Sequence, residues 1–419
     1  MKYKQSLPFL ISAVFFSTSF HSTNPSPAGT IAYIKDEKEI RIMLADGSGD
    51  HRLWTHKDAQ PHSGIEDLAW SPDGTELVFS SGHASVTSLF HSDLYSIKRD
   101  STGFRKLTNP PDKNLYSKYP KGSVNVTVRN NSYSFQTSNA TAGVFFVYVA
   151  GAAEPQSVTV PPGASKTISF KSVADFGKKA QAIVAIYGNF RWFEAGTDVQ
   201  AGKSVKAPDL NISGNGIEYF GSFRPAWRSD GSEICYRTGV CTVERIPTDP
   251  PQGEFFYKPM FSGKAPFGSC SFDWGPTPEL ADQVIYTENS EESAIYQMTE
   301  GGAHPGIKLT NYSKIQYQIL NDLHWLPDGS GLLYSTPDLM RQSSNVFRYD
   351  FKTRTTTQVT NLENEFAKKF DISPDGAWIV YERAKENDEN APSDIWVQQM
   401  NGSEAKVLVK NARSPSWTR

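Results

Sequence analysis

A short motif that recurs along the chain constrains its fold more than any other feature. The stretch WSPDGTELVFSS, residues 70–81, joins a tryptophan to a turn and then to a segment of alternating apolar residues. Pro72 presets the turn conformation, Asp73 can bond its own backbone, and Gly74 tolerates a positive φ. The alternation after the turn predicts a strand. The motif therefore predicts a β-hairpin.

Copies of this motif follow along the chain. They are PAWRSDGSEICYRT from Pro225, a weaker SFDWGPTPELADQVIYTE from Ser271, LHWLPDGSGLLYST from Leu323 and FDISPDGAWIVYER from Phe370. A second pair of predicted strands follows each copy. The aligned positions, which lie 157, 47, 51, 47 and 45 residues apart, are Trp70, Trp227, Trp274, Trp325, Ile372 and Trp417. Four strands per unit and a period of this length are typical of a β-propeller.

The two ends of the chain together predict one more unit. GTIAYI from Gly29, EIRIML from Glu39 and HRLWT from His51 supply three strands of a unit that lacks its first strand. ARSPSWTR, from Ala412, supplies a first strand with nothing after it. Joining the two ends gives a sixth blade and closes the ring, which removes open sheet edges.

The repeat of WSPDG, an apolar strand with Phe or Tyr, D-[LI]-[YW] and then L-T resembles the TolB-type propeller repeat. The resemblance covers most of residues 29–108 and 217–419. It implies an all-β, six-bladed TolB-like propeller and favours a protein partner. Because many unrelated functions use this blade, the resemblance specifies the fold more closely than the function.

The longest interval exceeds the others by about 110 residues, which predicts an inserted domain. GSVNVTVRN, GVFFVYVAG, QSVTVPPGASKTISF and AQAIVAIYG read as strands, and VTVPPGASKTISF reads as a hairpin with a polar tip. We predict an immunoglobulin-like β-sandwich over residues 118–208. The propeller then occupies residues 29–111, with blades 1 and 2, and residues 217–419, with blades 3 to 6 and the closing strand of blade 1.

The first residues predict export. MKYKQSLPFLISAVFFSTSF has two lysines before an apolar run that is too short to span a bilayer, so residues 1–28 are interpreted as a signal peptide and leader. The other interpretation is a frayed N-terminal strand. The net charge of −3 gives no basic stripe, so we expect no nucleic-acid partner. The expected protein is a periplasmic or secreted monomer with no membrane span.

Three cysteines are too few for a disulfide framework. Cys235 and Cys241 flank a predicted hairpin with Thr238 at its tip, where they would face each other. The alternatives are a cross-strand disulfide in an oxidising compartment and two free buried thiols. Cys270 is interpreted as a small buried residue.

Several enzyme classes lack their motifs in this sequence. It has no GxSxG motif, which excludes a serine peptidase of that kind, and no GxxxxGK[ST] phosphate loop. His62, His83 and His91 could converge with His324 on a metal, because some lyases that resemble this propeller use such a cluster. Solvent-exposed histidines are the simpler interpretation, so we expect no cofactor, with calcium or another divalent metal as the alternative.

The predicted binding site is one mouth of the central channel. Residues three and four places before each aligned position lead into the innermost strands and should surround that mouth. Acidic groups would there face basic groups, and the mixed ring could grip a peptide or a charged small molecule, unless its members only pair with one another. The predicted rim residues are Glu66, Asp67, Phe223, Arg224, Asn321, Asp322, Lys368, Lys369 and Arg413.

Two functions fit these features. The first is a non-catalytic binding protein that presents the channel mouth and the inserted sandwich to a protein or glycan partner in the cell envelope. The second is a TolB-like propeller enzyme, a metal-dependent saccharide lyase or hydrolase acting at the channel mouth. Stoichiometric metal in the purified protein would favour the enzyme.

Overall fold

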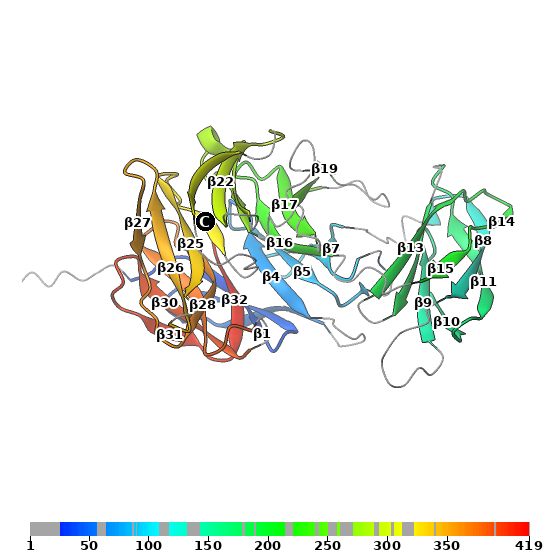
Figure 1. The fold of residues 1–419 in the computed structure, drawn as a ribbon, viewed down its shortest axis with the longest axis horizontal. Helices are drawn as coiled ribbons and strands as arrows, with labels where there is room; N and C mark the ends of the chain where they lie inside the picture. The colour runs from blue at the N-terminus through cyan, green and yellow to red at the C-terminus, as the bar shows by residue number, and fades with distance from the viewer. Residues whose placement is uncertain are drawn as a thin grey trace, which may run out of the picture.

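The structure is a computed structural model of the whole chain. It describes residues 26–56, 64–85, 88, 90–108, 117–131, 143–177, 181–187, 190–213, 221–238, 243–249, 258–259, 271–288, 293–302, 306–311, 322–338, 341–388 and 391–418. The predicted signal peptide lies almost entirely outside these residues. The chain is all-β, as predicted (Figure 1).

Four antiparallel sheets of four strands each come from the propeller repeats. Their strand orders are β3-β2-β1-β32, β4-β5-β6-β7, β16-β17-β18-β19 and β20-β21-β22-β23. A 3-10 helix at Pro278–Leu280 follows β20. The strands are β1 (Thr30–Lys35), β2 (Glu39–Leu44), β3 (His51–Thr55), β4 (Ile65–Trp70), β5 (Glu76–Ser81), β6 (Asp93–Lys98), β7 (Arg105–Lys106), β16 (Ser222–Trp227), β17 (Glu233–Thr238), β18 (Val243–Pro247), β19 (Lys258–Pro259), β20 (Phe272–Trp274), β21 (Gln283–Glu288), β22 (Ala294–Thr299), β23 (Ile307–Asn311) and β32 (Ala412–Trp417).

The last two repeats share an eight-stranded sheet. Two antiparallel runs of four strands meet in it at one parallel pairing, between β26 and β28. Each run has the strand pattern of the other four-stranded sheets. The strands are β24 (Leu323–Trp325), β25 (Gly331–Asp338), β26 (Ser343–Asp350), β27 (Thr355–Gln358), β28 (Phe366–Ile372), β29 (Trp378–Ala384), β30 (Ser393–Gln399) and β31 (Lys406–Val409).

The hairpins form for the reasons that their sequence gives. At the first motif, the Ser71 hydroxyl donates to Asp73 at 2.6 Å and accepts the backbone N–H of Glu76 at 2.9 Å. Gly74 has a φ of 68°, in the left-handed region where glycine costs least. The aligned tryptophans are all buried, with 7% exposure or less, and Trp227 Nε1 donates to the Ala69 carbonyl of the preceding sheet at 3.0 Å. These residues are therefore core between neighbouring sheets.

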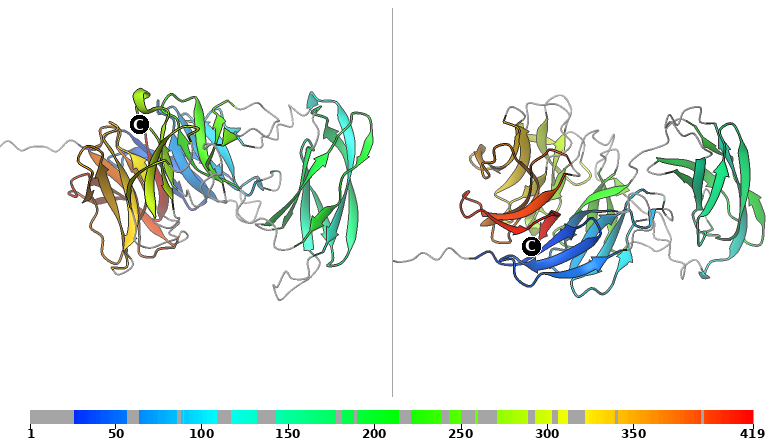
Figure 2. Two further views of the ribbon diagram at one scale, coloured as in Figure 1. Left: turned by 45° about the horizontal axis from the view of Figure 1, so that its top comes forward. Right: turned by 90° about the horizontal axis from the view of Figure 1, so that it is seen from below.

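The C-terminal strand completes the N-terminal sheet, as predicted. β32 pairs antiparallel with β1, with Trp417 opposite Ile31 and Ala412 opposite Lys35. Trp417 is 1% exposed, and its Nε1 donates to the Ala28 carbonyl at 2.8 Å. The end of the chain thus lies among the strands of the propeller (Figure 2).

The inserted segment forms a two-layered unit to one side of the propeller (Figures 1 and 2). One sheet has the order β10-β9-β12-β13, and in the other β11 and β14 flank β8, with β15 also paired to β8. A single hydrophobic cluster, drawn from both sheets, lies between residues 124 and 212. The strands are β8 (Lys121–Asn130), β9 (Gly143–Val149), β10 (Gln156–Val160), β11 (Ser165–Ala174), β12 (Gln181–Tyr187), β13 (Phe190–Thr197), β14 (Ser204–Lys206) and β15 (Leu210–Ile212).

Two details of the insert differ from the sequence-based expectations. The predicted hairpin VTVPPGASKTISF is wrong, because β10 pairs with β9 in one sheet and β11 pairs with β8 in the other. The turn between them crosses from one layer to the next, which lets both strands bury residues in the shared core. Leu210 and Ile212 are also fully buried in that core, so it reaches beyond the predicted end at residue 208.

One buried arginine connects the insert to the propeller. Arg191, on β13, is fully buried, and its guanidinium donates to the carbonyl oxygens of Phe90 at 3.2 Å and Ser85 at 3.5 Å. Both acceptors lie in the connection between β5 and β6. Burial lowers the pKa of Arg191 to about 10, so the group remains charged at neutral pH.

Candidate functional site

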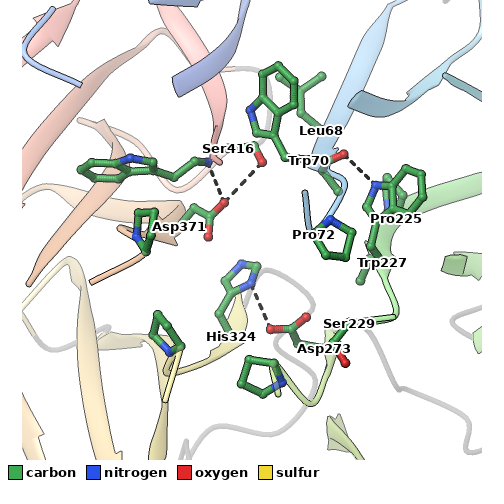
Figure 3. Close-up of a pocket in the computed structure, with 16 residues that line it drawn as sticks. Leu68, Trp70, Pro72, Pro225, Trp227, Ser229, Asp273, His324, Asp371 and Ser416 are labelled. Atoms are coloured by element: carbon green, nitrogen blue, oxygen red, sulfur yellow. Dashed lines mark hydrogen bonds and ion pairs between the residues drawn. The ribbon is translucent and has the colours of Figure 1, made fainter. Parts of the chain in front are cut away.

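A cavity of about 280 Å³ opens among the hairpin turns of the propeller (Figure 3). We call it the turn cavity. Its walls include residues two places after the aligned positions, and its floor includes residues one place before them. The wall residues of this kind are Pro72, Ser229, Pro276, Pro327 and Pro374, and the polar floor residues are Asp273, His324, Asp371 and Ser416.

His324 is the central charged group of the floor. Its Nδ1 lies 3.5 Å from an oxygen of Asp273, and its Nε2 lies 3.6 Å from an oxygen of Asp322. Burial opposes protonation, but the two carboxylates outweigh it and raise the pKa of His324 well above its usual value. The ring is therefore an imidazolium at neutral pH, with about a quarter of its side chain exposed.

The two floor carboxylates hold neighbouring strands together. Asp273 accepts the backbone N–H of Trp325 at 3.0 Å. Asp371 accepts the backbone N–H of Trp417 at 2.7 Å (Figure 3). Each bond joins one innermost strand to the next. These oxygens thus have a structural role, while the carboxylates still contribute negative charge to the cavity.

A second layer of charge lies deeper in the channel, around a cavity of about 60 Å³ that shares His324 and Asp371 with the turn cavity. We call this layer the charged ring. Its members occupy the position three residues before each aligned residue, and four of them were predicted rim residues. They are Asp67, Arg224, Ser271, Asp322, Lys369 and Ser414.

The charges of this ring pair with one another. Lys369 forms an ion pair with Asp67, and Arg224 lies 3.6 Å from Asp322. Burial alone would disfavour the charge on Asp67, but Lys369 and Arg224 hold the pKa of that carboxyl below its usual value. Asp322 also accepts the backbone N–H of Phe370 at 3.0 Å. These four side chains therefore pair with one another, which was the alternative to a rim that grips a ligand.

Backbone irregularities accompany the ring. Arg224 and Ser414 have φ values of 49° and 50°, which non-glycine residues seldom adopt. Bulges interrupt the pairing of β4, β16 and β28 around these positions. Bulges often re-aim side chains at functional or packing sites.

The residues four places before the aligned positions have other contacts. Arg413 donates to the Ile65 carbonyl at 3.0 Å, and Lys368 donates to the Asp388 carbonyl. Phe223 is 4% exposed beneath the guanidinium of Arg237. Asn321 lies outside the described residues.

Glu66, next to Asp67 of the charged ring, is unusual in having a pKa near neutral pH. Burial, together with the adjacent Asp67 carboxylate, raises the pKa of Glu66 to about 7, although Lys369, Arg413 and Arg237 oppose the shift. The side chain is partly exposed. Glu66 therefore changes its charge near neutral pH, unlike the carboxylates that are tied to cations.

His83 and His324 do not converge on one site, as the metal hypothesis required. His83 lies against Trp54 and Tyr95, with ring centroids 5.1 and 4.5 Å away, whereas His324 lies in the channel. His91 is buried, and His62 lies outside the described residues. Within the described part of the chain, no group of three or more His, Cys, Asp or Glu side chains is placed to hold a metal ion.

Cys235 is a free, fully buried thiol. The strand register places it opposite Arg245 on β18, because Arg237 pairs with Val243 and the hairpin tip lies beyond Thr238. Of the two alternatives, Cys235 thus fits the free buried thiol. Cys241 and Cys270 lie outside the described residues.

The sequence-based expectation missed the floor of the turn cavity. The signal was present in FDW, LHW, FDI and PSW, where a polar residue comes directly before the aligned position. Residues from this position and from the charged ring line the same smaller cavity, with His324 and Asp371 beside Asp67 and Lys369. The proline of each turn was attributed only to turn formation.

Several solved structures are similar to this chain at low identity. TolB from Acinetobacter baumannii aligns with 94% of this chain and 67% of its own, at 13% identity and a TM-score of 0.49. A chain of a nidogen/laminin complex aligns with 93% of this chain and 99% of its own, at 9% identity and a TM-score of 0.45. The sequence matches no protein-family model and no curated protein. No described segment forms a helix long and apolar enough to cross a membrane.

Proposed function

We propose that this protein is an exported, non-catalytic binding protein of the TolB-like propeller type, with a closed six-bladed ring and an inserted immunoglobulin-like sandwich. It presents the turn cavity and the insert to a protein or glycan partner in the cell envelope, in the periplasm or outside the cell. It works as a monomer and without a cofactor.

Contacts between neighbouring four-stranded groups support the closed ring. β32 contacts β4, β4 contacts β16, and β16 contacts β20. β20 contacts β24, β25 contacts β28, and β28 contacts β32. Six four-stranded groups joined in this cycle are what a six-bladed propeller requires.

The turn cavity carries the functional part of the proposal. It is concave, its walls are largely proline and tryptophan, and a few polar groups converge on its floor, which is the usual composition of a recognition site. Its charged groups are fixed by each other and by backbone N–H groups. A general acid or base needs a pKa near the working pH. The pKa values of the paired His324 and Asp322 are shifted away from neutral pH, and Glu66, whose pKa is about 7, does not line the turn cavity.

Blocking the cavity tests this function. Ser229→Trp places a large side chain in the cavity wall and should abolish capture of the partner from an envelope extract. Ser403→Trp, in an exposed outer hairpin, is the matched control and should capture normally. Equal capture by both variants would move the binding site elsewhere. Metal analysis of the purified protein tests the enzyme alternative, which stoichiometric manganese, zinc or calcium would favour.

A further inference from the structure

A groove continues from the turn cavity across the surface. This groove, of about 470 Å³, lies between the turns after β4 and β16 and shares Pro72, Trp227 and Ser229 with the cavity. We call it the inter-sheet groove. The two hollows together offer an elongated site that begins in the channel and runs outward between two neighbouring sheets.

The groove is strongly acidic. Four carboxylates and one guanidinium line it, and they are Asp73, Glu76, Asp230, Asp249 and Arg105. Arg105 lies 3.2 Å from Glu76 and 3.3 Å from Asp249, so a single cation serves two of the acids.

The remaining two acids of the groove stay ionised without a cation of their own on its walls. Hydrogen bonds from Ser71 and Thr75 hold the pKa of Asp73 below its usual value. Asp230 is approached by Arg228 at 3.0 Å, but that arginine also forms an ion pair with Glu300. The groove therefore keeps a negative potential.

The cavity end has the same sign. Asp273, Asp371 and the imidazolium of His324 give its floor a net negative charge. The cavity and the groove are continuous through Pro72, Trp227 and Ser229, so the negative charge extends along the whole elongated site.

We propose that the turn cavity and the inter-sheet groove bind an extended, basic peptide segment of a partner protein. One basic side chain, or the amino terminus, enters the cavity, where the proline walls pack on its methylene stem and the floor carboxylates balance its charge. Further basic residues follow the acidic groove. This inference rests on the proposed function, because it names the chemistry of the partner for the same cavity.

The probe that tests the inference is a nine-residue peptide of alternating lysine and proline, with a free amino terminus and a fluorescent label at the other end. Matched peptides replace each lysine by glutamine or by glutamate. Fluorescence anisotropy should show the lysine peptide binding more tightly than the glutamine peptide, with affinity falling as salt rises. The glutamate peptide should not bind. Equal binding of the lysine and glutamine peptides would overturn the inference.

Variants locate the binding. Each of Asp230→Asn and Asp249→Asn should weaken the lysine peptide roughly 2- to 5-fold, as expected for exposed charge pairs. Each of Asp338→Asn and Glu363→Gln removes the same single charge outside the groove and should bind as the wild type does. Equal weakening in the groove and control variants would mean non-specific attraction and would overturn the inference. Because the exposed groove acids carry little packing, this arm remains decisive even if Ser229→Trp does not fold.

The outcome also separates the inference from the proposed function. If Ser229→Trp loses the envelope partner but the lysine peptide binds no better than the glutamine peptide, the cavity is a binding site and its basic-peptide chemistry is wrong. A partner released by glycosidase treatment would identify a glycan instead. If Ser229→Trp changes neither partner capture nor peptide binding, both proposals fail.

Discussion

Removing Asp322 should test whether the charged ring holds the propeller together. This side chain, 15% exposed, pairs with Arg224 and with His324 and accepts the backbone N–H of Phe370. Losing a buried backbone acceptor costs about 1–3 kcal/mol. Exposed ion pairs contribute about 0–1 kcal/mol to stability, and breaking a fully buried pair costs about 3–5 kcal/mol. The ion pairs of Asp322 are partly buried, so their contribution should fall between these values. We expect Asp322→Ala to lower the free energy of unfolding by about 3–5 kcal/mol.

A conservative variant separates the contribution of the Asp322 charge from that of its hydrogen bond to Phe370. Asp322→Asn keeps an acceptor for Phe370 but loses the charge, so it should cost about 1–2 kcal/mol, roughly the ionic share. In a double-mutant cycle, Arg224→Met should cost less in the Asp322→Ala background than in the wild type. The Met side chain keeps the apolar stem of the arginine and removes its charge.

The pH dependence follows from His324. A raised imidazole pKa stabilises the folded state fully below the pKa of the unfolded chain, and this contribution is lost as the pH rises through the folded value. Destabilisation by Asp322→Ala should therefore be largest near pH 6 and should shrink at alkaline pH. Urea unfolding followed by tryptophan fluorescence measures all of these changes. Additive single variants, each costing less than about 0.5 kcal/mol, would refute the structural role of the ring.

Three further perturbations have defined outcomes. Glu66→Gln should stabilise the protein at pH 8 by about 2 kcal/mol and have little effect at pH 4, because the raised pKa of Glu66 penalises the ionised native state only above the unfolded value; unfolding curves at the two pH values check this. Arg191→Met should weaken docking of the insert by about 2 kcal/mol, which faster hydrogen exchange in β13 and at residues 90–92 would reveal, whereas unchanged exchange would contradict the anchoring role. Deleting residues 412–419 should cost at least the roughly 3–5 kcal/mol of a buried tryptophan and expose the edge of β1, so the truncated protein should aggregate; a soluble protein that melts like the wild type would argue against closure.

The repeat pattern predicted most of the propeller because its determinants are local. Pro72, Gly74 and the alternating residues after them act within a dozen positions, and the aligned tryptophans mark the buried end of each first strand. The pairing of β32 with β1 also followed from counting strands at the two ends. These features need no knowledge of distant neighbours.

Features that depend on distant partners were harder to predict. The prediction of a hairpin at VTVPPGASKTISF was wrong because alternating apolar and polar residues suit two strands of one sheet as well as two strands of different sheets. The prediction that Cys235 faces Cys241 was based on an assumed hairpin tip at Thr238. The register of β17 and β18 instead places Cys235 opposite Arg245. Similarly, the sequence placed Arg224 and Asp322 at one rim but could not show that they lie within 3.6 Å of each other.

The pairing of β32 with β1 also governs when the molecule can finish folding. Of the described strands, β1 is synthesised first and β32 last, so the N-terminal sheet lacks its innermost strand until all the other described strands have been made. Contacts between such distant segments slow folding, and unpaired edges expose the chain to aggregation while it waits. The N-terminal sheet can therefore be completed only after β32 has been made.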